Sequence, residues 1–230
     1  DFQALISGEL GTLTYESLFS NKRIVLFALP GAYTPTCSSA QTPSYVKLEP
    51  EFKRHGIDAI YCLSVNDPFD MHAWSKDQNA SNLTFLADGN GVFTREMGFL
   101  VDKSDLSFGP RSWRYAMVVN NGVIEAMFVE PDKPGDPYEV SDAETVLRHI
   151  APSAEIPKDI TIITKPGCKH CTRAKALLSN AGYDYEEIVI GKAGVSMNSL
   201  HAITGRKTVP QVFVDGDHIG GAEELSHWLD

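Results

Sequence analysis

Cysteine is scarce in this chain, and the scarcity limits the class of protein it can encode. Four cysteines occur among 230 residues, too few for a secreted disulfide scaffold. Two of them form a CxxC motif, and the other two, Cys37 and Cys62, stand alone. This usage favours a reducing compartment in which thiols do chemistry, so we expect a cytoplasmic protein; a periplasmic chain with two structural disulfides is the alternative.

Long basic runs and long apolar runs are also missing. The formal net charge is −10 and no Lys/Arg-rich segment occurs, which argues against a nucleic-acid or anionic-membrane partner. No apolar stretch approaches the roughly 18 residues that a membrane span needs, and no signal-peptide pattern is present. No GxGxxG follows a predicted strand, so any use of NADPH would need a separate reductase.

The first part of the chain alternates between strand and helix patterns. The run NNG at 120–122, between two apolar segments, predicts a hairpin. Ser141 and Glu144 form a capping-box pattern, which predicts Ser141 as a helix N-cap. Strands are predicted at 24–29, 58–65, 84–86 and 114–119, and helices at 39–54, 69–79 and 141–150.

A segment rich in proline and small residues at 151–158 is interpreted as a linker, and a shorter α/β pattern follows it. The sequence thus predicts an α/β protein with domains at 1–150 and 159–230. In the second domain, strands are predicted at 160–164, 185–190 and 211–215, and helices at 168–181, 195–204 and from 221.

The CxxC motif lies where the strand 160–164 meets the next helix. A thiol at a helix N-terminus faces unpaired N–H groups and the positive end of the dipole, which favour the thiolate. Cys168 lies at the predicted helix N-terminus, and Cys171 lies one turn further on, where it can close a short disulfide with Cys168. Pro210 of the TVP run, if cis, would bring the Val209 backbone beside the sulfur.

Two structural interpretations of the CxxC are weaker. A zinc knuckle needs four ligands, yet His170 is the neighbouring candidate and no second CxxC occurs, so we predict no metal site. A purely structural CxxC disulfide is the second of these interpretations.

Residues 159–230 resemble a glutaredoxin through KPGCKHC, TVP and GGAEEL. The resemblance implies that Cys168 is the nucleophile that carries glutathione. Glutathione is an anion, so cationic side chains and a helix N-terminus suit its carboxylates. The implied glutathione-binding residues are Lys165, Arg206, Thr208, Val209, Pro210, Gly221, Ala222 and Glu223.

Cys37 follows the apolar strand 24–29 in the segment PGAYTPTC and opens a helical pattern. A free cysteine is often a buried structural residue, but hydroxyl-bearing residues on both sides make this setting polar. Cys62, inside the apolar segment YCLSV, fits the structural role better.

Residues 1–150 resemble a peroxiredoxin of the peroxiredoxin 5 type. The matching segments are PGAYTPTC, CLSVND, ADGNGVFT and RYAMVVNNGVIE. The resemblance implies that Cys37 is the peroxidatic cysteine, with Pro30, Thr34 and Arg114 forming its pocket. Both domains would then have thioredoxin-like folds, and relatives of the first domain commonly form homo-oligomers, here expected as a dimer or tetramer.

Many peroxiredoxins of this group carry a second, resolving cysteine late in the domain, but none occurs here between Cys62 and Cys168. The two resemblances together imply a glutathione-dependent peroxidase for hydrogen peroxide and alkyl hydroperoxides, with no bound cofactor. Glutathione would resolve the Cys37 sulfenic acid, Cys168 would clear the mixed disulfide, and glutathione reductase with NADPH would act downstream. A peroxide sensor that relays oxidation to client proteins and an iron–sulfur carrier are the rival hypotheses.

Overall fold

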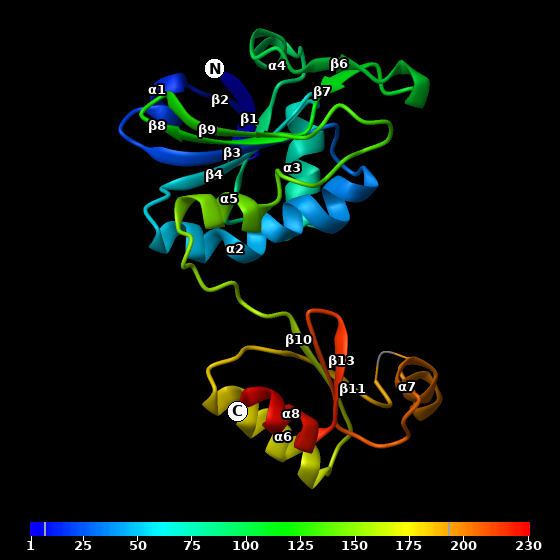
Figure 1. Ribbon diagram of the computed structural model, residues 1–230. Coiled ribbons are helices and arrows are strands. Elements are labelled where there is room, and N and C mark those ends of the chain that lie inside the picture. The colour runs from blue at the N-terminus through cyan, green and yellow to red at the C-terminus, as the bar shows by residue number, and fades with distance from the viewer. Residues whose placement is uncertain (7, 193) are drawn as a thin grey trace. The chain divides into compact units, whose positions relative to one another are not determined.

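The computed structural model describes residues 1–6, 8–192 and 194–230. The chain divides into two compact units, 1–156 and 157–230, each with its own sheet (Figure 1). This confirms the predicted α/β class. No helix in the described parts of the chain is long and apolar enough to cross a membrane.

The first unit is built on a seven-stranded sheet in the order β2-β1-β5-β4-β3-β8-β9. The strands β3, β4 and β5 are parallel, and β8 runs antiparallel to β3. The strands of this unit are β1 (Phe2–Ile6), β2 (Glu9–Leu13), β3 (Arg23–Leu29), β4 (Ala59–Ser64), β5 (Thr84–Ala87), β8 (Tyr115–Asn120) and β9 (Val123–Val129), with a separate hairpin of β6 (Leu100–Asp102) and β7 (Pro110–Ser112).

Helices cover both faces of this sheet, so its central strands are buried on both sides. Val25 and Phe27 of β3 pack into one core, while Ile24 and Leu26 pack into the other, as period-two alternation requires. Helices α2, α3 and α5 supply the first core and α1 and α4 border the second. Their bounds are α1 (Tyr15–Phe19), α2 (Thr42–Arg54), α3 (Pro68–Asp77), α4 (Val92–Glu96) and α5 (Ala143–Ile150), with a π-helical turn η1 (Cys37–Gln41) and a 3₁₀ turn η2 (Ser104–Leu106).

The predicted N-cap of the last helix of this unit is wrong by one residue. Asp142 caps α5, because its carboxylate accepts a hydrogen bond from the Thr145 backbone at 2.8 Å. Ser141 is fully buried, and its hydroxyl donates to the carboxylate of Glu130 at 2.7 Å instead.

The second unit has a four-stranded sheet in the order β11-β10-β12-β13. Figure 1 shows α6 and α8 together on one side of this sheet and α7 on the other. The bounds are β10 (Ile160–Thr164), α6 (Lys169–Asn180), β11 (Glu186–Val189), α7 (Met197–Thr204), β12 (Gln211–Val214), β13 (Asp217–Gly220) and α8 (Ala222–Leu229). A small core between the sheet and α6 and α8 holds the unit together.

The segment predicted as a linker lies mostly against the first unit. Ala154 is buried in the first core, and Ala151 and Ile156 pack against it. Beyond it, Lys158 forms an ion pair with Asp215 of the second unit at 2.7 Å. The division between the units therefore falls at Ile156 and Pro157, later than the predicted start of the linker.

Candidate active site

Cys37 lies at the start of η1, just beyond the loop that follows β3, and is fully buried. π-Helical turns are uncommon and occur often at functional sites. The loop before it is held in place by Asn66, whose side-chain oxygen accepts from the Ala32 backbone at 3.1 Å. Two hydrogen bonds of 2.9 and 3.4 Å from Thr34 to the Gly31 carbonyl tighten the turn. The thiol thus has a defined position between a strand and a helix.

Arg114, next to the start of β8, points its guanidinium at this thiol. Its Nη1 lies 3.5 Å from the Cys37 Sγ and also donates to the side-chain oxygen of Gln41. The side chain is 1% exposed, and its Nη2 donates to the carboxylate of Asp136. Burial alone would lower the pKa of Arg114, but the hydrogen bond to Asp136 and the charge on Cys37 raise it instead. A permanent positive charge therefore faces the sulfur.

A pocket of about 380 Å³ opens beside this group. Pro30 and Thr34 line it, as predicted, although the Thr34 hydroxyl is directed to the Gly31 carbonyl. The remaining lining residues are Pro35, Thr36, Lys103, Asp105, Leu106, Phe108, Gly135 and Asp136. Pro30 and Thr34 therefore line a pocket next to the buried pair of Cys37 and Arg114, and Asp136 connects the two because it both lines the pocket and binds Arg114.

Three further residues of this site were missed from the sequence. Gln41 and Asp136 both bind Arg114, and the ring of Tyr138 lies 5.7 Å from its guanidinium carbon. Gln41 sits four residues after Cys37, which is one helical turn, so helical spacing from the thiol was an available signal. Asp136 and Tyr138 come from the proline-rich loop at 131–137 and its end, and no local pattern indicated their place.

Cys62 is buried in β4 opposite Phe27. Burial raises the pKa of its thiol well above the ordinary value, and the neighbouring Cys37 raises it further. A buried neutral thiol is a poor nucleophile, which agrees with the structural role predicted for Cys62.

In the second unit, Cys168 is the N-cap of α6. Its sulfur accepts a hydrogen bond from the Cys171 backbone at 3.2 Å and lies 3.6 Å from the Val209 carbonyl oxygen. The Val209–Pro210 peptide is cis, as the predicted placement of Val209 required. Cys171 is buried, and burial together with the hydrogen bond to Cys168 raises its pKa to about 11. All four cysteines of the chain are free thiols in this structure.

The residues predicted to bind glutathione differ in exposure and in their partners. Lys165, Thr208 and Glu223 are exposed. The Arg206 guanidinium forms an ion pair with Glu224 at 2.9 Å, and the Glu224 carboxylate also accepts from the Gly221 backbone. The side chain of Ala222 is buried in the core of the unit, so only its backbone can face a ligand.

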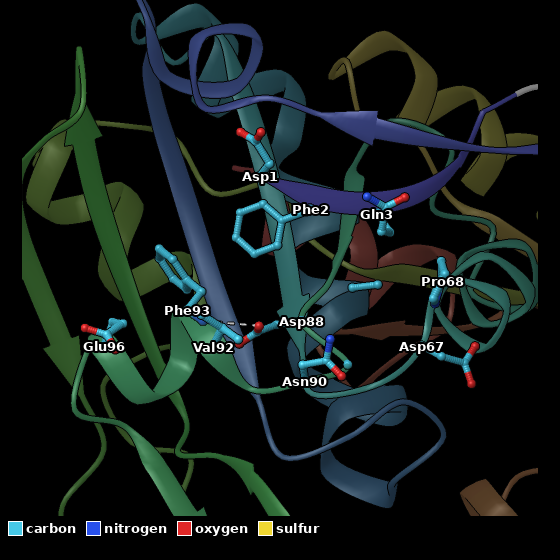
Figure 2. Close-up of a pocket in the computed structure, with 12 residues that line it drawn as sticks. Asp1, Phe2, Gln3, Asp67, Pro68, Asp88, Asn90, Val92, Phe93 and Glu96 are labelled. Atoms are coloured by element: carbon cyan, nitrogen blue, oxygen red, sulfur yellow. Dashed lines mark hydrogen bonds between the residues drawn. The ribbon is translucent and has the colours of Figure 1, made fainter.

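Another pocket, of about 550 Å³, lies elsewhere in the first unit (Figure 2). Two of its acidic side chains form structural hydrogen bonds: Asp67 caps α3, and the Asp88 carboxylate accepts from the Phe93 and Thr94 backbones. No cysteine is among the described residues that line it. It therefore offers no thiol chemistry.

Metal binding finds no support in the described parts of the chain, where no three His, Cys, Asp or Glu side chains are grouped so that they could hold an ion.

Comparison with known proteins agrees with the two units. The redoxin family model matches residues 1–147, and the glutaredoxin family model matches residues 160–219. The hybrid peroxiredoxin hyPrx5 of Haemophilus influenzae is 51% identical over 217 residues, which cover 94% of this chain and 90% of that protein. A peroxiredoxin of Synechocystis is 54% identical over 148 residues, covering 63% of this chain and 78% of its own.

A solved structure resembles the first unit. Reduced Prx3 from Vibrio vulnificus, in complex with hydrogen peroxide, is 42% identical and superimposes with a TM-score of 0.61. The match covers 65% of this chain and 92% of that one. The predicted pair of thioredoxin-like domains is thereby confirmed, and the chain belongs to the hybrid peroxiredoxins, thiol peroxidases in which a redoxin domain is fused to a glutaredoxin domain.

Proposed function

We propose that the protein is a glutathione-dependent peroxidase for hydrogen peroxide and alkyl hydroperoxides, with Cys37 as the peroxidatic cysteine. The Cys37 thiolate attacks one peroxide oxygen, the O–O bond breaks, and water or an alcohol leaves while Cys37 becomes a sulfenic acid. The observation that carries this step is the buried Arg114 guanidinium 3.5 Å from the sulfur. A preorganised donor of this kind stabilises the charge that develops on the leaving oxygen.

Resolution of the sulfenic acid is assigned to glutathione. Its thiolate attacks the Cys37 sulfur, an S–S bond forms, and the hydroxyl leaves as water. Cys62 is the other cysteine of the first unit, but its burial and raised pKa make it a poor attacking group. A small external thiol suits a site without a reactive second cysteine.

Cys168 then removes glutathione from Cys37. Its thiolate attacks the glutathione sulfur, Cys37 leaves as a thiolate, and a second glutathione releases oxidised glutathione from Cys168. The hydrogen bond from the Cys171 backbone to the Cys168 sulfur supports this assignment, because such donors stabilise a sulfur that carries negative charge. Glutathione reductase would return the oxidised glutathione with electrons from NADPH.

The test is peroxide-dependent NADPH oxidation in the presence of glutathione and glutathione reductase. We expect Cys37→Ser to abolish turnover and Cys168→Ser to reduce it to a small fraction, since both thiols carry the cycle. Cys171→Ser and the control Cys62→Ala should keep most of the activity. Full activity in Cys168→Ser would contradict the proposal and favour a second domain that serves other client proteins.

A further inference from the structure

The loop at 131–138 brings a carboxylate to the peroxide pocket. The loop is fastened at its end, because the buried carboxylate of Glu130 accepts hydrogen bonds of 2.8 to 3.0 Å from the backbones of residues 139, 140 and 141. Asp136, on this loop, places both carboxylate oxygens against Nη2 of Arg114. It also lines the pocket of about 380 Å³ with Pro30 and Thr34.

Asp136 therefore shares one guanidinium with the reactive sulfur. Nη1 of Arg114 faces Cys37 and Nη2 faces Asp136. When Cys37 is a thiolate, two negative charges share one positive charge, and one of the two, Asp136, lines the pocket. Arg114 is 1% exposed and the Asp136 side chain is 42% exposed, so water screens the Asp136 charge in part and hardly reaches the guanidinium.

The other charged groups that line the pocket do not neutralise this excess of negative charge. Asp105 adds a further negative charge. Lys103 is the remaining cation, and its ammonium group lies 4.9 Å from the centre of the Trp113 ring, which holds it against the aromatic face. A substrate that enters this pocket consequently meets a field with an excess of negative charge.

We propose that Asp136 is a specificity-determining residue that makes the pocket select neutral hydroperoxides over hydroperoxides with a negative charge near the peroxide group. A neutral peroxide needs only hydrogen bonds from Arg114, which can bind it beside the carboxylate. An anion has to compete with Asp136 for the same guanidinium and approach a thiolate of its own sign. The inference rests on the proposed role of Cys37 and leaves the bond-making steps of the reaction unchanged.

The experiment uses two substrates that differ in one charge: 4-hydroperoxy-4-methylpentanoate and its methyl ester. The full-length protein carries Cys168→Ser and Cys171→Ser, so that Cys37 is the thiol that reacts. Rate constants for oxidation of reduced Cys37 are measured by stopped-flow fluorescence in single turnover, without glutathione. The quantity of interest is the ratio of the ester rate constant to the acid rate constant. Asp136→Asn removes the carboxylate charge that pairs with Arg114. Asp105→Asn is the matched control, because it removes an equal charge from the lining of the same pocket and leaves the ion pair of Arg114 intact.

We expect a ratio of about tenfold in the parent protein, the effect of one partly screened charge at close range. Asp136→Asn should reduce the ratio to about twofold, whereas Asp105→Asn should keep most of it. A ratio near one in the parent, an unchanged ratio in Asp136→Asn, or an equal fall in both variants would each overturn the inference. Failure of the proposed role of Cys37 looks different, because neither substrate would then oxidise that thiol.

Discussion

At the scale of single residues, Cys168 and Cys171 show how position within one motif gives two thiols different exposure and different reactivity. Cys168 is the half-buried N-cap of α6, and a backbone N–H points at its sulfur. Cys171 is one turn further on and buried, and its pKa is raised to about 11. Cys168 is therefore the more accessible of the two thiols, and the raised pKa of Cys171 makes that thiol the weaker nucleophile.

Brief treatment of the reduced protein with iodoacetamide at pH 7 should therefore alkylate Cys168 and spare Cys171. A thiol with a pKa of about 11 is ionised to only about one part in ten thousand at that pH. Peptide mapping by mass spectrometry measures the extent at each cysteine. Cys62 is the internal control, since it should react only after unfolding; equal labelling of Cys168 and Cys171 would contradict the assignment.

The thiols and Arg114 were predictable from the sequence, but two partners of Arg114 were not. PGAYTPTC and the CxxC are local patterns, and each thiol lies at the start of the helical segment that those patterns indicated. Asp136 reaches Arg114 from 22 residues away in sequence, through a loop whose path is set by the buried carboxylate of Glu130. Such a contact depends on tertiary structure, which no local spacing encodes.

At the scale of elements, Glu130 joins the end of β9 to the start of α5. Its buried carboxylate accepts hydrogen bonds from the backbones of residues 139, 140 and 141 and from the Ser141 hydroxyl. Burial alone would raise the pKa of Glu130, but these hydrogen bonds lower it below the ordinary value. The same contacts explain why Ser141 does not cap α5, as its hydroxyl is already engaged.

Glu130→Gln should destabilise the first unit by about 1–3 kcal/mol at pH 7, the cost of weakening a buried charged acceptor. Because the folded pKa of Glu130 is depressed, its contribution is present above the unfolded pKa of about 4.3 and is lost as the pH falls through the folded value. The difference from the parent protein should therefore shrink below about pH 4.

Urea unfolding of the full chain from pH 7 to pH 3 measures this difference, with fluorescence from Trp74 and Trp113 reporting on the first unit. Glu139→Gln is the matched control, because that carboxylate forms an exposed ion pair with Lys133 and should contribute less than about 1 kcal/mol. A Glu130→Gln effect that stays constant over the whole pH range would refute the account of the carboxylate.

The prediction of elements was good where periodicity is strong and poor where strands are short or rich in glycine. β3 and β10 coincide with the predicted segments within one residue at each end. The hairpin of β1 and β2 was missed, since Gly8 and Gly11 interrupt its apolar pattern and its strands are half exposed. The hairpin of β6 and β7 has only three residues in each strand, too few to show a period of two.

At the scale of the whole molecule, the connection between the two units is shorter than its composition indicates. Proline and small residues predicted a linker at 151–158, yet Ala154 is buried in the first core and Lys158 pairs with Asp215 in the second unit. Apolar side chains scattered through a segment without periodicity gave no sign that it would pack. Most of the predicted linker therefore belongs to the folded part of one unit or the other.

The central claim is that glutathione passes from Cys37 to Cys168, and locating that glutathione is its most direct test. Reduced full-length protein carrying Cys171→Ser is mixed with one equivalent each of peroxide and glutathione, alkylated at intervals, and mapped by mass spectrometry. The account predicts an adduct that forms on Cys37, moves to Cys168, and stays on Cys37 when Cys168 is also replaced by serine. An adduct that remains on Cys37 beside an intact Cys168, or one that reaches Cys168 equally fast in Cys37→Ser, would contradict it.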